Sequence, residues 1–177
     1  MSEPERPILV MLAGPNGAGK TTFYEAHLAT LGLPFINADN LSWTLGLTAY
    51  EAANEAERIR EIYIKKRIGF VSETVFSDPV GAKLAFLSRA VEAGFDVHLI
   101  FIQIRDVELS CARVRDRVAA GGHDVPEDKL KKRFKRTQTN LKKACDALPH
   151  VLIYDNSSHQ MPFRLQAEYR EGKRIVP

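Results

Sequence analysis

The sequence predicts an α/β fold in which a central, mostly parallel sheet lies between two layers of helices. Short apolar runs typical of strands alternate with longer amphipathic segments typical of helices, an order that implies right-handed crossovers. The run 95–104 is almost wholly apolar, as expected for a strand covered on both faces. With 177 residues, 45% of them hydrophobic and 27% charged, the chain is expected to form a single domain over 1–177.

The first strand is predicted at 8–12, an apolar run followed by a glycine-rich turn. The helix after this turn is expected to end near Leu31, because Gly32 can adopt the left-handed conformation that ends helices. A short second strand follows at 35–38, with Asp39 just beyond its carboxyl end.

A helix at 50–68 comes next and is expected to end at Gly69. It is predicted from apolar residues at helical spacing, namely Ala52, Ala56, Ile59 and Tyr63. The third strand is predicted at 70–75. Asp78 then starts another helix, which Gly94 ends. Its apolar residues are Val80, Leu84, Leu87 and Val91.

After the strand at 95–104, Asp106 is placed to cap a helix that runs to about Ala120. The next helix has a core-facing stripe made of Leu130, Phe134, Thr137, Leu141, Ala144 and Leu148. A last core strand is predicted at 151–154. The alternating tail, 163–169 and 174–176, predicts a terminal hairpin at the sheet edge.

The segment directly after the first strand fits the phosphate-binding pattern G-x-x-x-x-G-K-S/T. It predicts a three-layer P-loop NTPase fold that binds ATP, with GTP as the alternative. In such a loop the backbone N–H groups surround phosphates, Lys20 reaches the β- and γ-phosphates, and the Thr21 hydroxyl ligates Mg²⁺. The expected nucleotide-binding residues are Gly14, Pro15, Asn16, Gly17, Ala18, Gly19, Lys20, Thr21 and Thr22.

Polar side chains at the carboxyl ends of the other strands are candidates for chemistry, because ligands of parallel sheets gather at that edge. Asp39 is predicted to act as general base or as a water-mediated Mg²⁺ ligand, unless it only caps a helix. Glu73 and Thr74 are predicted to bind the phosphate acceptor, the alternative for Glu73 being a structural acid at a strand end. Asn156 is placed to contact the adenine base or to form a turn.

The segment 105–143 is predicted to be a basic helical lid, since it holds twelve Lys or Arg against six Asp or Glu. Arg113, Arg117 and Arg133 are the candidates to neutralise a transferred phosphoryl group. The alternative is a solvated helix face. His123 either contacts the substrate or fixes the turn between the two helices.

Composition excludes several classes of protein. The net charge of +3 suggests an anionic ligand. Phe134 is the only aromatic residue in the basic stretch 129–143, so we do not expect nucleic acid as a partner. The two cysteines lack metal-ligand spacing, and the apolar runs are too short to span a bilayer. Because 1–7 is polar, we expect no signal peptide before the first strand. These features favour a cytoplasmic location without a membrane contact.

Four segments together resemble the zeta-toxin-like P-loop kinases, over most of residues 8–170. They are the phosphate loop, Asn37-Ala-Asp-Asn-Leu41, Ser72-Glu-Thr-Val-Phe-Ser77, and Arg117-Val-Ala-Ala-Gly-Gly-His-Asp-Val-Pro126. The resemblance implies that Asp39 is the base toward the acceptor hydroxyl, that Glu73 binds the sugar substrate and that lid arginines stabilise the phosphoryl group. It also leaves open an antitoxin-like protein partner.

Zeta toxins phosphorylate UDP-N-acetylglucosamine and carry an arginine and a histidine soon after the catalytic acid, whereas this chain has neither at 40–45. The leading hypothesis is therefore an ATP- and Mg²⁺-dependent kinase acting on a hydroxyl of a polar small molecule, with a nucleotide sugar such as UDP-N-acetylglucosamine as one acceptor. The alternatives are a nucleotide-dependent switch or partner-binding module, and a polynucleotide end kinase.

Overall fold

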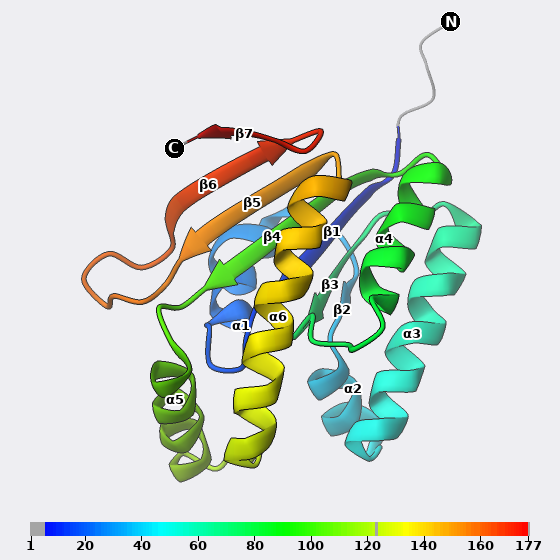
Figure 1. The fold of residues 1–177 in the computed structure, drawn as a ribbon. Coiled ribbons are helices and arrows are strands. Elements are labelled where there is room, and N and C mark those ends of the chain that lie inside the picture. Colours follow the sequence, from blue (N-terminus) through cyan, green and yellow to red (C-terminus); the bar gives the residue numbers. More distant parts are fainter. Residues whose placement is uncertain (1–5, 123, 177) are drawn as a thin grey trace, which may run out of the picture.

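The computed structural model describes residues 6–122 and 124–176 and shows one seven-stranded sheet with helices on both faces (Figure 1). The strands are β1 (Ile8–Ala13), β2 (Phe35–Ile36), β3 (Phe70–Thr74), β4 (Asp96–Gln103), β5 (His150–Asp155), β6 (Arg164–Arg170) and β7 (Lys173–Val176). The helices are α1 (Lys20–Phe23), η1 (Tyr24–Leu28), η2 (Ala29–Leu31), α2 (Ala38–Leu45), α3 (Ala49–Lys66), α4 (Ala82–Glu92), α5 (Val107–Ala119) and α6 (Glu127–Ala147).

The strand order is β2-β3-β1-β4-β5-β6-β7. The pairs among β1 to β5 are parallel, while β5 with β6 and β6 with β7 are antiparallel. The predicted α/β class, the mostly parallel sheet and the terminal edge hairpin are therefore confirmed.

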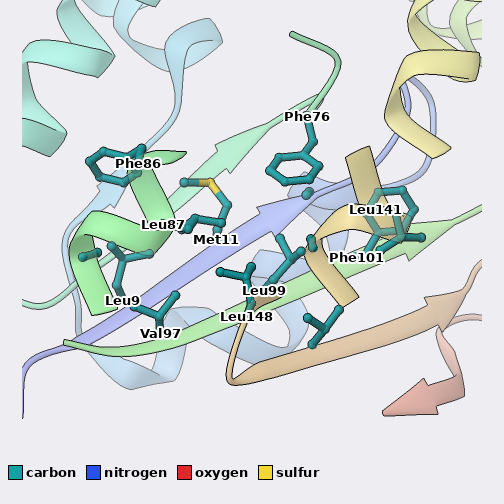
Figure 2. Close-up of a cluster of buried hydrophobic side chains, with 14 of the residues drawn as sticks. Leu9, Met11, Phe76, Phe86, Leu87, Val97, Leu99, Phe101, Leu141 and Leu148 are labelled. Atoms are coloured by element: carbon teal, nitrogen blue, oxygen red, sulfur yellow. The ribbon is translucent and has the colours of Figure 1, made fainter. Parts of the chain in front are cut away.

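The two faces of β1 contribute to two separate cores, because side chains alternate along a strand. Leu9 and Met11 pack into the larger core, which α4 and α6 cover, and Figure 2 shows Met11 beside Leu87 and Phe101 beside Leu141. Val10 and Leu12 face the opposite core with residues of α1 and η1. Helices on both faces of one sheet give the three layers that the sequence predicts.

Several predicted boundaries need correction. The helix after the phosphate loop ends at Leu31 before a left-handed Gly32, as predicted, but it is divided into α1, a π-helical η1 and a 3-10 η2. Helix α3 ends at Lys66, because the C-cap residue Arg67 adopts φ 53°, and it does not extend to Gly69. Val80 is 84% exposed, because α4 starts only at Ala82.

Helix α2 was not predicted. It begins because the Asn37 side chain accepts hydrogen bonds from the backbone N–H groups of Asp39 (2.8 Å) and Asn40 (3.3 Å). Asn37 is therefore the N-cap, and the capping role considered for Asp39 is wrong. The side chain of Asp39 is left for other contacts.

Helix α6 is joined to the segment after β3 by two buried side chains. Thr137 Oγ1 donates to the Val75 carbonyl at 3.0 Å. Asn140 Nδ2 donates to the carbonyls of Phe76 (3.0 Å) and Asp78 (2.9 Å). In Figure 1, α2 with the start of α3 on one side, and α5 with the start of α6 on the other, extend beyond the carboxyl edge of the sheet. These projections flank the candidate site.

Candidate active site

The phosphate loop connects β1 to α1 in a shape that side chains would obstruct. Gly14 has φ +146°, and a Cβ there would lie 2.3 Å from the Ile102 carbonyl oxygen. Gly19 has φ +89°, and a Cβ there would lie 2.6 Å from Asn156 Nδ2. Both positions require glycine, since a side chain would collide with fixed neighbours. This local geometry matches the loop predicted from the sequence.

Three side chains hold the loop through its carbonyl groups. Ser110 Oγ donates to the Asn16 carbonyl at 2.7 Å, and Arg113 Nη1 donates to the Gly17 carbonyl at 3.3 Å. Asn156 Nδ2 donates to the Ala18 carbonyl at 2.8 Å. Arg113 and Asn156 thus support the loop from outside the cavity described below. The predictions were a contact with the phosphoryl group for Arg113, and a contact with the base or a turn for Asn156.

Lys20 is held inside the loop. Its Nζ donates to the Gly14 (3.0 Å) and Pro15 (3.2 Å) carbonyls and lies 3.8 Å from Glu73 Oε1. Burial, with 7% of the side chain exposed, lowers the pKa of Lys20, and the negative charges of Glu73 and Asp39 act in the opposite direction. A buried ammonium group that is bonded mainly to carbonyls can exchange these partners for phosphate oxygens.

Glu73, at the carboxyl end of β3, faces the start of α1. Its Oε2 accepts from Thr21 Oγ1 (3.1 Å) and from Asn37 Nδ2 (2.8 Å). Asn37 therefore both caps α2 and orients this carboxylate. We predicted Glu73 as a ligand of the acceptor or as a structural acid, and the structure places it beside the hydroxyl predicted for Mg²⁺. No cluster of three or more His, Cys, Asp or Glu that could hold a metal ion occurs in 6–122 and 124–176.

A cavity of about 580 Å³ lies next to these groups. Six predicted site residues line it, namely Asn16 of the loop, Asp39, Glu73, Thr74, Arg117 and Arg133. Its size is within the range of small-molecule sites. The predicted base, the predicted acceptor ligands and two arginines of the predicted lid therefore lie around one space. His123 lies outside the described residues.

Sequence reasoning missed several charged residues of the cavity wall. They are Glu57, Arg60, Asp78, Lys83, Asp124, Lys129 and Arg136. Arg60 and Glu57 belong to a helix whose other charged residues are mostly exposed, so the pattern gave no signal for them. Asn37 could have been found, because Asn before an Asp-Asn pair is a common helix start.

A family model described as Zeta toxin matches residues 36–164. A relative from Haemophilus influenzae (strain ATCC 51907 / DSM 11121 / KW20 / Rd), described as an uncharacterized protein, is 31% identical over 130 residues. That alignment covers 71% of this chain and 91% of the relative.

Solved structures resemble the fold. A chain of the AvrRxo1-ORF1:AvrRxo1-ORF2 complex with sulphate ions has a TM-score of 0.75 at 16% identity, and one of the complex with ATP has 0.74 at 18%. Both cover 97% of this chain, which spans only 61% and 60% of theirs. A chain from the PezAT toxin-antitoxin system of Streptococcus pneumoniae has a TM-score of 0.63 at 18% identity, covering 87% of this chain and 70% of its own. Such low identities show the fold alone. Among the helices of the described residues, none combines the length and apolar character needed to cross a membrane.

Proposed function

This chain belongs to the zeta toxin family, and from that membership we propose that it is a kinase that transfers the γ-phosphate of ATP to a hydroxyl of a polar small molecule. The observation that carries the proposal is that Asp39, Glu73 and Asn16 of the phosphate loop line one cavity of about 580 Å³. Phosphoryl transfer depends mainly on positioning and charge neutralisation, which such an arrangement supplies.

The loop residues fit a triphosphate. Gly14 and Gly19 leave no side chain over the loop, and Lys20 holds its ammonium group on carbonyls that phosphate oxygens can replace. Thr21, and Asp39 through water, would hold Mg²⁺, with Glu73 bonded to the Thr21 hydroxyl. The metal ion supplies neutralisation of phosphate charge.

Asp39 would remove the proton from the acceptor hydroxyl. Because Asn37 caps α2, the exposed Asp39 carboxylate is not engaged in capping and lines the cavity. Arg117 of α5 and Arg133 of α6 line the same cavity and would neutralise the transferred phosphoryl group. Arg113 would act indirectly, by holding the Gly17 carbonyl of the loop.

The acceptor class that we propose includes nucleotide sugars such as UDP-N-acetylglucosamine, and an antitoxin-like protein is a proposed partner. The support for this partner is family membership and the toxin-antitoxin origin of one structural relative. We also propose a cytoplasmic location.

The test is transfer of label from the γ-phosphate of ATP to a pool of polar metabolites in the presence of Mg²⁺. We expect a labelled product that Lys20→Ala and Asp39→Asn abolish, while Asp128→Asn, an exposed acid of α6 outside the cavity, keeps it. Hydrolysis without transfer to any acceptor would contradict the proposal. Capture of a protein only with nucleotide would favour the switch, and label on oligonucleotide ends would favour the end kinase.

A further inference from the structure

Arg60 is a buried cation in the wall of the cavity. It lies on α3, 5% of its side chain is exposed, and its Nη1 donates to Ser72 Oγ at 3.1 Å. Ser72, which is fully buried on β3, donates in turn to the Ile36 carbonyl at 3.2 Å. The guanidinium group is thus fixed in place by the sheet.

The contacts of Arg60 leave much of its hydrogen-bonding capacity unused. A guanidinium group carries five N–H donors. Among the described residues it makes the bond to Ser72 and one longer ion pair, Nη2 to Glu57 Oε1 at 3.8 Å. Burial lowers the pKa of Arg60, which reflects the cost of taking this charge out of water. Such a cation is poorly compensated by the protein alone.

Arg60 lies at one end of a stripe of α3 that lines the cavity. The stripe consists of Ala49, Ala53, Ala56, Glu57 and Arg60. From Ala49 to Arg60 the helix rises roughly 16 Å, at about 1.5 Å per residue. The three alanines keep this wall of the cavity open, and the arginine provides a charged end. A ligand that extends along the stripe therefore meets a guanidinium group there.

The other charges near Arg60 favour an anion. Lys83, whose side chain is 18% exposed, also lines the cavity and forms an ion pair with Glu57. The Asp78 carboxylate is engaged by the backbone N–H groups of Ala82 and Lys83 at the start of α4. Glu61, whose negative charge also acts on Arg60, is paired with Arg89. Arg60 and Lys83 therefore share one further carboxylate, that of the half-exposed Glu57.

We propose that Arg60, assisted by Lys83, binds an oxyanion of the phosphate acceptor, so that the acceptor is an alcohol that also carries a phosphate or carboxylate group. That the bound molecule is the phosphate acceptor rests on the proposed function, whereas the binding of an anion at Arg60 does not. The oxyanion takes the cavity-facing N–H groups of Arg60 while the acceptor hydroxyl faces Asp39. Neutral sugars lack this group and are poor acceptors.

The anion site is tested by calorimetry with inorganic phosphate and, separately, malonate, using protein saturated with Mg²⁺ and a non-hydrolysable ATP analogue. With the loop filled, we expect at least one of these anions to bind, and Arg60→Gln to weaken it at least tenfold. The control is Arg58→Gln, since Arg58 lies on the same helix, is 64% exposed and pairs with Glu55. Failure of wild type to bind either anion, or equal binding by Arg60→Gln, overturns the proposal.

Two further measurements keep this result separate from the proposed function. If the analogue does not bind, the kinase proposal fails, and the same anion titrations of Lys20→Ala, with and without Arg60→Gln, still decide whether Arg60 holds an anion. If Arg60→Gln does not fold, Lys83→Met takes its place, with an expected severalfold loss of anion affinity. In transfer assays, a neutral sugar preferred over hydroxy acids and sugar phosphates would also overturn the proposal.

Discussion

Replacing Asn140 by alanine is expected to lower the free energy of unfolding by about 2 to 4 kcal/mol. The Asn140 side chain is 6% exposed and donates to the carbonyls of Phe76 (3.0 Å) and Asp78 (2.9 Å). Two such bonds contribute about 1 to 3 kcal/mol together, and the void left by the amide costs about 1 kcal/mol more. For a chain of this size the midpoint of thermal unfolding should fall by roughly 4 to 16 °C.

Urea unfolding followed by far-UV circular dichroism measures this change. The control is Thr139→Ala on the same helix. The exposed Thr139 hydroxyl donates to the Lys135 carbonyl one turn earlier, and its loss should change the free energy by less than about 0.5 kcal/mol. If Asn140→Ala is as stable as the control, the two carbonyls find other donors. Our account of how α6 is held to the segment after β3 would then be refuted.

Three other predictions concern the loop, the base and the core. Asp39→Asn should lower kcat by about 10² to 10⁴-fold with nucleotide affinity retained, as calorimetry and transfer assays would show; an unchanged kcat speaks against a base. Gly19→Ala places a Cβ 2.6 Å from Asn156 Nδ2 and should weaken binding of a fluorescent ATP analogue by roughly tenfold or more. Gly32→Ala, with nothing within 4 Å, should leave that affinity unchanged. Burial and Asp146 raise the pKa of Cys145 from 9.0 to about 11. The unfolded chain then loses the thiol proton first, so stability should fall as pH rises from about 9 to 11, by at most about 2 to 3 kcal/mol. In Cys145→Ala the urea unfolding midpoint should therefore fall less over this pH range. An equal fall in the variant would contradict the attribution to Cys145.

The fold was predictable wherever the spacing of apolar residues agrees with the residues that begin and end helices and strands. The strand expected at 95–104 is β4 (Asp96–Gln103), and Asp106 caps α5 as predicted, accepting from the Leu109 N–H at 2.8 Å. Prediction was weaker where side chains decide a boundary. Asp78 bonds to N–H groups four and five residues ahead, which delays the start of α4 beyond Val80. No periodicity reveals such a contact.

The site was predictable where a residue type and its place at a strand end suffice. Asp39 follows β2, and Glu73 lies at the carboxyl end of the adjacent parallel strand β3, so topology alone brings them together. Arg60 differs, because its burial depends on how α3 packs on β3 and on the hydroxyl of Ser72. The sequence does not distinguish Arg113 from the other arginines of its helix. Only the packed structure shows that Arg113 is the one whose side chain reaches the Gly17 carbonyl.

The attachments of α5 and α6 restrict which part of the basic helical pair can bend. Ser110 and Arg113 attach α5 to the phosphate loop by hydrogen bonds. Thr137 and Asn140 attach α6 in the same way to the segment after β3. A rigid swing of the whole segment 105–143 would pull the loop out of shape. We expect the pivots to lie inside these anchors, so that hydrogen exchange changes on nucleotide binding are concentrated between residues 114 and 136. The phosphate loop would then keep its shape while Arg117 and Arg133 move toward the bound nucleotide.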